Sequence, residues 1–292
     1  MRSCTKSTNW HADILIGGTV GFVCNFRERV AQCMKRVQKS PEEPGLLARY
    51  KQRYPHDTWE KFHHRSRDGY RQVKQQILHD QHGLCAYCEI NIKLTEEEDR
   101  VDDFRVEHFH PKTGTENAEC NYHLEWKNML GACHGGSQPK VAEAGYRFSK
   151  TKEDRSCDVP KGGKSINTEI LNPLQIPAKE TLFSFDSFSG AMSVDEEKCP
   201  EMLRRKAGNT IVELNLNAPR LKRLRKAVIE VLQDQVTEMV GQGLSVEETM
   251  DQLAHELLVP NSEDYYPAFF TTIRWFLGEA AEKVLRERDY VI

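Results

Sequence analysis

The sequence contains no apolar run long enough to cross a membrane, no internal repeat and no low-complexity tract. A membrane-spanning helix needs about 20 predominantly apolar residues, so we expect no transmembrane segment and no membrane partner. The chain also lacks a strong charge of either sign, with a formal net charge of −3 over 292 residues. This length is sufficient for two modest domains, or for one module wrapped by a helical body.

Residues 1–33 have no helical or strand period. Ile14–Cys24 is mildly apolar and rich in Gly, but it has no basic region of normal form and no A-x-A-like site follows it, so we do not interpret it as a secretory signal. A different kind of sequence begins at Met34. Two interpretations stay open: residues 1–33 are a native extension, or Met34 is the true start.

The small net charge conceals an uneven distribution. Eleven Lys or Arg and five acids lie between Lys35 and Lys74, and eight Lys or Arg and one acid lie between Arg204 and Lys226. After Lys226 the balance reverses, with thirteen acids and four bases. Basic segments of this kind suit a phosphate backbone. They are also typical of solvated helix faces, and the sequence does not decide between the two.

The nine cysteines favour a metal site. An odd total that includes a Cys85-x-x-Cys88 pair indicates a metal in a reducing compartment rather than a disulfide framework, so we predict a cytoplasmic protein. A CxxC turn places two thiolates on one side of a tight loop, and Cys133 with Cys157 can supply the second pair. A redox-active CxxC is the weaker alternative, because no thioredoxin-like βαβ pattern surrounds Cys85.

Apolar spacing predicts helices on both sides of this cysteine region. Residues 46–81 have helical periodicity with a break at Pro55, and Gly83 follows the last turn. Phe104–His108 alternates as a short strand, and we predict a second strand over Tyr122–Leu130 with Trp126 in a small core. The C-terminal region predicts a β-hairpin over 181–193 and helices over about 202–214, 218–240, 246–258 and 266–288, with a capping box at Ser245.

The central stretch contains the groups that phosphodiester hydrolysis requires. The reaction needs an activated water and a cation to neutralise the charge that develops on the phosphate. A histidine such as His108 can take a proton near neutral pH, and the carboxylate or amide oxygens of Glu107, Asn128 and Asp158 suit Mg²⁺. We therefore interpret the region as a candidate nuclease site.

These motifs resemble the HNH endonucleases of the ββα-metal fold: His108 at a strand end, Asn128, Cys133, and the Cys157-Asp158-x-x-Lys161 ending. The resemblance implies that His108 is the general base and that Asn128 steadies the loop between the strands. It implies that Glu107 and Asp158 bind a catalytic Mg²⁺ or Mn²⁺. A structural zinc would be held by four cysteines, namely Cys85, Cys88, Cys133 and Cys157.

Two departures from the family pattern affect these assignments. The third letter of the motif is Asp158, so the triad is His-Asn-Asp, and 23 residues replace the usual two between Cys133 and Cys157. His134 is therefore an alternative fourth zinc ligand, although Cys157 is preferred because Asp158 and Lys161 follow it in the family's register. His110 can also assist the metal, or it is simply a loop histidine.

Further motifs are similar to the HNH subunit of the Septu anti-phage systems, also found in retron-associated operons. They are Cys85-Ala-Tyr-Cys-Glu89, Val106-Glu-His-Phe-His-Pro-Lys112, Trp126-Lys-Asn-Met-Leu-Gly-Ala-Cys-His-Gly-Gly136, Leu171-Asn-Pro-Leu174 and Thr210-Ile-Val-Glu-Leu-Asn-Leu-Asn217. This similarity implies an endonuclease effector that cuts nucleic acid under the control of an ABC or SMC-like ATPase partner. DNA is the preferred substrate in this interpretation, and RNA is the alternative. A zinc-binding adaptor that no longer cuts is the alternative, but an adaptor would not need an intact His108, Asn128 and Asp158 set.

The combined prediction is an α+β protein with a small zinc-stapled ββα-metal core, a helical N-terminal arm and a mainly helical C-terminal domain. The predicted divisions are an extension (1–33), an arm (34–82), the HNH module (83–170) with an insertion at 134–156, and a hairpin with the helical C-terminal domain (171–292).

Overall fold

A computed structural model describes residues 35–177 and 179–290. The two interpretations of residues 1–33 concern a segment outside these ranges. None of the helices within the ranges is both long and apolar enough to span a membrane. The elements are α1 (Gly45–Arg53), α2 (Trp59–Arg65), α3 (Arg67–Asp80), β1 (Phe104–His108), the 3₁₀ helix η1 (Trp126–Asn128), β2 (Met129–Cys133), α4 (Ala144–Arg147), α5 (Asp158–Lys161), β3 (Phe183–Phe185), β4 (Met192–Val194), α6 (Glu201–Glu213), α7 (Pro219–Gly241), α8 (Val246–Leu257), α9 (Phe270–Leu277) and α10 (Glu279–Glu287).

The helical arm has the predicted periodicity and one more break than predicted. Helices α1 and α2 both pack against α3, and Phe62, Val73 and Ile77 are fully buried between them. The first break lies around Pro55, and the second at Ser66, which ends α2 and precedes α3. The arm therefore presents an apolar face of α3 to β2.

The two central strands form an antiparallel pair in which Phe104 is opposite Cys133 and His108 is opposite Met129. The prediction for β1 is confirmed, but the prediction for the second strand is wrong in position. Residues 122–124 form a turn and η1 follows shortly after, so β2 begins only at Met129. The physical reason is the buried Asn128 side chain, whose amide donates to the carbonyl of Tyr122 and so satisfies this segment locally rather than in a ladder. Trp126 is buried, as predicted.

The C-terminal half contains the predicted hairpin, β3 with β4, and the predicted capping box of α8. The Ser245 hydroxyl accepts from the Glu248 amide, and the Glu248 carboxylate accepts from the Ser245 amide. The single helix predicted over 266–288 is wrong, because Gly278 adopts φ +55° and separates α9 from α10. A positive φ is incompatible with a continuing α-helix.

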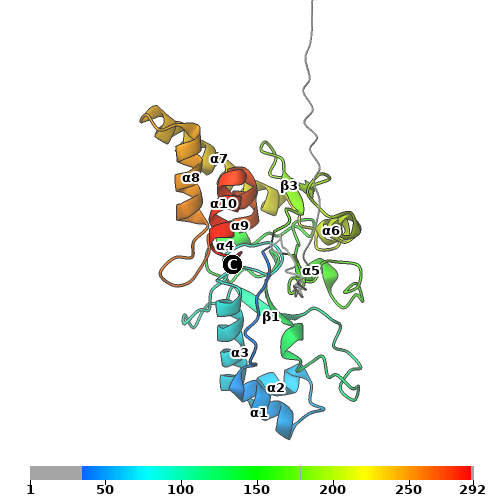
Figure 1. Ribbon diagram of the computed structural model, residues 1–292. Coiled ribbons are helices and arrows are strands. Elements are labelled where there is room, and N and C mark those ends of the chain that lie inside the picture. The colour runs from blue at the N-terminus through cyan, green and yellow to red at the C-terminus, as the bar shows by residue number, and fades with distance from the viewer. Residues whose placement is uncertain (1–34, 178, 291–292) are drawn as a thin grey trace, which may run out of the picture.

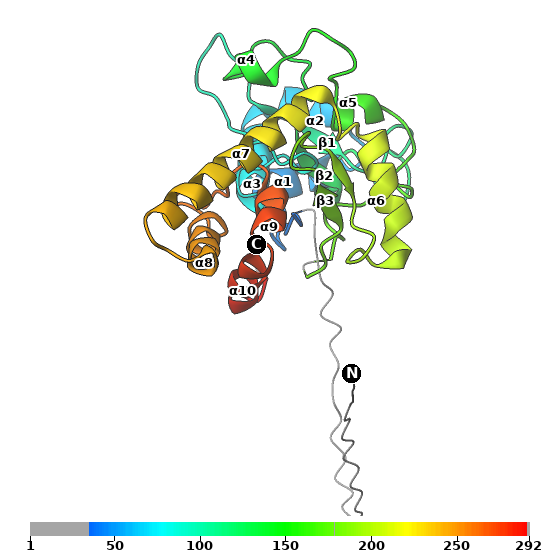
Figure 2. The same ribbon diagram turned by 90° about the horizontal axis from the view of Figure 1, so that it is seen from above.

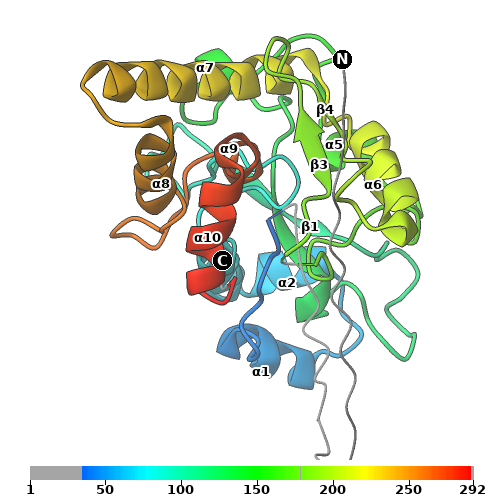
Figure 3. The ribbon, with the colours of Figure 1, turned by 45° about the horizontal axis from the view of Figure 1, so that its top comes forward.

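The chain is of the α+β class, with the arm helices α1 and α2 at one end, helices α7 to α10 toward the other, and β1 between them (Figure 1). Viewed from above, α7 runs diagonally across the molecule (Figure 2). Helices α8 and α10 lie beside each other on one side of α7 (Figure 3). One hydrophobic cluster includes residues of the arm, the central strands, the hairpin and α7, and a second is built mainly from α7 to α10. The central strands therefore fold within a core to which the arm and α7 also contribute.

Candidate metal centre and active site

Four buried thiols converge beside β2. The side chains of Cys85, Cys88, Cys133 and Cys157 place their sulfurs within 4.8 Å of one another. The Cys85–Cys157 sulfurs are 3.9 Å apart, and those of Cys88–Cys133 and Cys133–Cys157 are each 3.6 Å apart. Tetrahedral zinc with Zn–S bonds of about 2.3 Å requires sulfur–sulfur edges of about 3.8 Å. The cluster could therefore hold a zinc ion.

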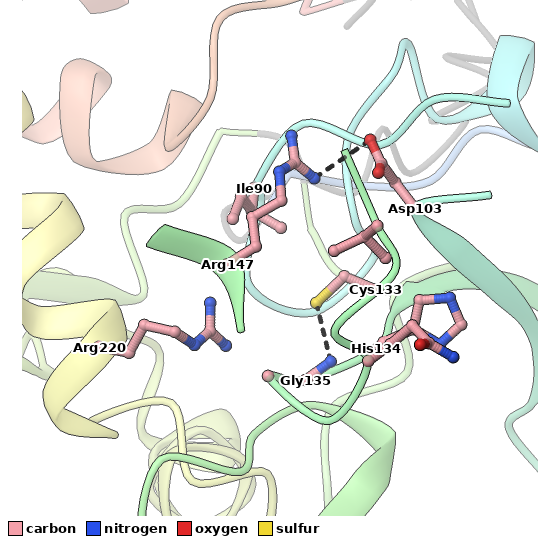
Figure 4. Close-up of a pocket in the computed structure, with 10 residues that line it drawn as sticks. Ile90, Asp103, Cys133, His134, Gly135, Arg147 and Arg220 are labelled. Carbon is pink, nitrogen blue, oxygen red and sulfur yellow. Dashed lines mark hydrogen bonds and ion pairs between the residues drawn. The ribbon is translucent and has the colours of Figure 1, made fainter. Parts of the chain in front are cut away.

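Backbone amides support the cluster in the way that bound thiolates require. The Cys133 amide donates to the sulfur of Cys85 at 3.2 Å, and the Gly135 amide donates to the sulfur of Cys133 at 3.4 Å. Figure 4 shows the second of these contacts, with the Asp103–Arg147 ion pair on the other side of Cys133. Such amides offset part of the negative charge that four thiolates would bring to a buried site.

Gly135 joins the two ends of the 23-residue insertion between Cys133 and Cys157. Gly135 has φ +54°, and its carbonyl accepts a hydrogen bond from the Ser156 amide at 3.1 Å. A Cβ at this position would lie 2.1 Å from the Ser156 carbonyl oxygen. Only glycine permits this approach of the two backbones. It places Cys157 next to Cys133 despite the insertion, which contains only the four-residue helix α4.

His134, the alternative fourth ligand, lies outside the sulfur cluster. Its Nε2 is 2.8 Å from the carbonyl oxygen of Asp102. A carbonyl can only accept, so Nε2 carries the proton in that contact. The structure therefore brings Cys157, and not His134, to the other three cysteines.

The two faces of β1 present different chemistry. Side chains alternate along a strand, and the burial of β1 follows that alternation. Arg105 and Glu107 face α5, where they pair with Asp158 and Lys161. His108 faces the arm, where its ring contacts Trp59 of α2 with centroids 5.2 Å apart. The structure therefore brings Glu107 and Asp158 together and places the imidazole of His108 on the opposite face, at the last residue of the strand.

Two ion pairs neutralise the carboxylates. Asp158 accepts from Nε and Nη2 of Arg105 at 2.5 and 2.9 Å. Glu107 accepts from Nζ of Lys161 at 2.6 Å, and the same ammonium donates to the carbonyl of His108 at 3.1 Å. Burial raises the pKa of Glu107, the positive charge of Lys161 opposes this, and the negative charge of Asp158 raises it further. Burial also raises the pKa of Asp158, against the opposing effect of Arg105.

His108 is held in one tautomer. Its Nε2 is 3.1 Å from the carbonyl oxygen of His123, so Nε2 carries the proton and Nδ1 keeps its lone pair. Burial lowers the pKa of His108 to about 3, and the positive charge of Lys112 acts in the same direction. The ring is covered by Trp59 and by the 109–128 loop, which Lys112 ties to Glu60 of α2 through an ion pair. In this state His108 is a neutral, weakly basic imidazole.

Asn128 fixes the loop between β1 and β2. Its side-chain oxygen accepts from the His110 amide at 2.7 Å, and its side-chain nitrogen donates to the carbonyls of His110 and Tyr122 at 3.1 and 3.0 Å. The side chain thus closes the loop at both ends. The ring of His110 stacks on Tyr122, with centroids 5.0 Å apart, and its Nδ1 contacts Asn167 at 2.9 Å. These contacts position His110 as a loop histidine.

Sequence reasoning did not assign the cations of this site. The strand pattern could have placed Arg105 beside Glu107, because a residue two positions before Glu107 lies on the same face of the strand. Lys161 belongs to the Cys157-Asp158-x-x-Lys161 motif, but nothing in the spacing predicts its pairing with Glu107. Glu89 follows the CxxC, and the sequence predicts no role for it. Its carboxylate accepts from the Thr271 amide at 2.8 Å and so connects the cysteine knuckle to the first turn of α9.

The fold and the site define an α+β protein with a buried four-thiol centre beside an antiparallel pair and a short helix. No model of a known protein family matches the sequence. Over 216 residues the chain is 32% identical to the Escherichia coli protein named "Retron Ec83 putative HNH endonuclease", and the match covers 67% of this chain and 79% of that protein. The chain belongs to the HNH endonuclease family of retron-associated systems. The resemblance read from the motifs is thereby confirmed, and membership supports a nuclease function.

Proposed function

We propose that this protein is a metal-dependent endonuclease that hydrolyses phosphodiester bonds in nucleic acid, with DNA as the preferred substrate. The observation that carries the proposal is the fixed tautomer of His108 in a chain of this family. With Nε2 donating to the His123 carbonyl, Nδ1 is the atom that can take a proton from an attacking water. A general base must present a free lone pair. Because this hydrogen bond keeps the proton on Nε2, the lone pair of Nδ1 is free.

The carboxylates of Glu107 and Asp158 would hold the catalytic Mg²⁺ or Mn²⁺. Hard oxygen ligands suit both ions, and the two side chains are close enough for the charge of Asp158 to raise the pKa of Glu107. Arg105 and Lys161 place positive charge beside the same carboxylates, since they pair with Asp158 and Glu107. The ion, once bound, would neutralise charge on the scissile phosphate.

The burial of His108 sets a requirement for the reaction. An imidazole with a pKa of about 3 is a poor base at neutral pH. A phosphodiester anion placed beside the ring would favour the protonated form and raise that pKa. Because Trp59 and the 109–128 loop cover the ring, substrate binding must also move part of this cover. We propose that Asn128 keeps the loop register during that movement.

The four-cysteine cluster would hold zinc in a structural role. All four thiols are buried and lie beside one another. Four cysteine ligands in a buried cluster are typical of closed structural sites rather than of catalytic sites with an open position. The cytoplasmic location follows as part of the proposal, since thiols are kept reduced there.

The relative's association with a retron supports a role in an anti-phage defence system of the Septu or retron type. We propose that the chain is the cutting subunit and that an ABC or SMC-like ATPase controls it. The C-terminal helices are a candidate docking surface, since α10 is strongly amphipathic and carries exposed Glu279 and Glu287. If a chain lacking residues 262–292 still co-purifies with the ATPase, this surface is not the docking site.

The central experiment incubates the purified protein, with and without the ATPase and nucleotide, with DNA and RNA in Mg²⁺ and in chelator. We expect Mg²⁺-dependent cleavage that His108→Ala abolishes and that His64→Ala, an exposed histidine of α2, leaves unchanged. Cleavage that survives His108→Ala contradicts the mechanism. If the protein contains zinc and binds nucleic acid but cleaves neither DNA nor RNA under any of these conditions, the adaptor alternative is favoured.

A further inference from the structure

A cleft of about 650 Å³ opens on the side of β1 that carries Arg105. Its walls come from α3, from the start of β1 and from the loop over residues 95–102. Four cationic side chains line it: Arg71, Lys74, Arg100 and Arg105. The cleft is open to solvent, so a ligand that extends beyond it can still enter.

Arg105 connects this cleft to the candidate active site. Its guanidinium binds both oxygens of Asp158, yet 41% of its side chain is exposed in the cleft. The side chains of Arg71 and Arg100 are 46% and 43% exposed. Lys74 differs, because it is buried and bound to Asp102 and to the carbonyl of Phe104. Three arginines therefore remain able to reach a ligand, and one of them already contacts the proposed metal-binding carboxylate.

The loop over residues 95–102 carries four consecutive exposed acids, Glu96–Asp99, of which Glu96 and Glu97 line the cleft. Glu96 lies 3.8 Å from Arg71, and Glu97 lies 2.7 Å from Arg100. Exposed ion pairs of this kind contribute at most about 1 kcal/mol to stability. A polyanion can therefore displace these carboxylates from the arginines at small cost, but their negative charge opposes its approach.

We propose that this cleft binds the phosphate backbone of the nucleic acid and that Glu96–Asp99 competes with phosphate for Arg71 and Arg100. The inference rests on the proposed nuclease function for the identity of the ligand. A polyanion fits better than a small anion, because the exposed cations are distributed over three separate elements of an open cleft instead of converging on one point. The acidic run thereby weakens binding of any nucleic acid that makes few contacts in the cleft.

The test measures binding of a fluorescent duplex by anisotropy, without added divalent cation, over a salt series. The cleft variant is Arg71→Gln with Arg100→Gln. The matched control is Lys283→Gln with Arg286→Gln, two exposed cations of α10 that are likewise paired with acids. We expect the cleft variant to bind about tenfold more weakly and to lower the slope of log Kd against log salt by about 2, since each phosphate contact contributes about 0.9. The control should stay within about twofold of the wild type.

The loop variant replaces the acids as Glu96→Gln, Glu97→Gln, Glu98→Gln and Asp99→Asn. We expect it to bind about fivefold more tightly than the wild type in about 50 mM salt and equally in about 0.5 M salt, where charges are screened. Thermal melting of each variant confirms that it is folded. A cleft variant that binds like the control, or a loop variant with unchanged affinity in low salt, overturns the inference. Cleavage is scored separately: absence of cleavage by the wild type contradicts the proposed function and leaves the binding result intact.

Discussion

At the scale of single residues, the ion pair between Lys161 and Glu107 should make the candidate site sensitive to substitution of either partner alone. Both groups are largely buried, and their atoms are 2.6 Å apart. Removing one partner of a buried pair leaves an uncompensated charge, whereas removing both charges together is often neutral.

We therefore predict that Lys161→Met lowers the free energy of unfolding by about 3 kcal/mol, measured by urea denaturation. Adding Glu107→Gln to that variant should restore at least half of the loss, because no isolated carboxylate remains. If the double variant is as unstable as the sum of the two single variants, the pair is not energetically coupled.

Tyr50 of α1 provides a pH-dependent contribution to stability. Its hydroxyl donates to the carboxylate of Asp57 at 2.7 Å. Burial raises the pKa of Tyr50 to about 12, and the hydrogen bond to Asp57 acts in the same direction. The pKa in the unfolded chain is about 10. The folded state therefore holds more protons between these values, and stability falls as the pH rises from about 10 to about 12, by up to about 3 kcal/mol.

We predict that Tyr50→Phe removes this alkaline loss and lowers stability at pH 7 by about 1–2 kcal/mol, through the lost hydrogen bond. Urea denaturation at a series of pH values measures both effects. Tyr54→Phe, in the neighbouring ring 5.0 Å away, should keep the alkaline loss. An unchanged pH profile for Tyr50→Phe would show that another group causes the loss.

At the scale of elements, the loop that follows β2 determines whether the cysteine cluster forms. Gly135 and Gly114 both have positive φ, at +54° and +79°. A Cβ on Gly135 would meet the Ser156 carbonyl, whereas a Cβ on Gly114 would meet nothing within 4 Å. An alanine at either position would strain the backbone, but only an alanine at Gly135 would also clash with another segment. Comparing the two variants therefore distinguishes the effect of strain from the effect of the clash.

We predict that Gly135→Ala lowers zinc content below one ion per chain and destabilises the protein by more than about 3 kcal/mol, because Cys157 is pushed away from Cys133. Gly114→Ala should cost about 1 kcal/mol, from strain alone, and keep full zinc content. Elemental analysis and urea denaturation provide the two readouts. Equal zinc content in both variants would contradict the role assigned to Gly135.

At the scale of the whole molecule, the cysteine cluster lies inside a core shared by the arm, the strands, the hairpin and α7. Binding energy for a structural zinc is folding energy, so its loss should affect all of these regions together. We predict that Cys157→Ala lowers the melting temperature by more than about 10 °C in a single transition. Calorimetry with metal analysis checks this. Unchanged melting together with full zinc content would remove the structural role of the cluster.

The sequence by itself determined what depends on neighbours along the chain. The Cys85-x-x-Cys88 turn, the alternation of β1, the Ser245 capping box and the hairpin all follow from spacings of a few residues, because local geometry repeats with a fixed period. The second strand was predicted over Tyr122–Leu130 and therefore too early in the chain, because the side chain of Asn128 bonds to the backbone of its own loop. The break at Gly278 was not predicted, because a helical pattern does not show a positive φ.

Only the tertiary structure decided which groups meet across long separations. It brought Cys157 to Cys133 over 23 residues through Gly135, and it excluded His134 from the sulfur cluster. It also paired Asp158 with Arg105 and Glu107 with Lys161, and it placed His108 on the opposite face of β1. The physical reason is that such contacts depend on how loops close and elements pack, and neither is encoded in the spacing of residues along one segment.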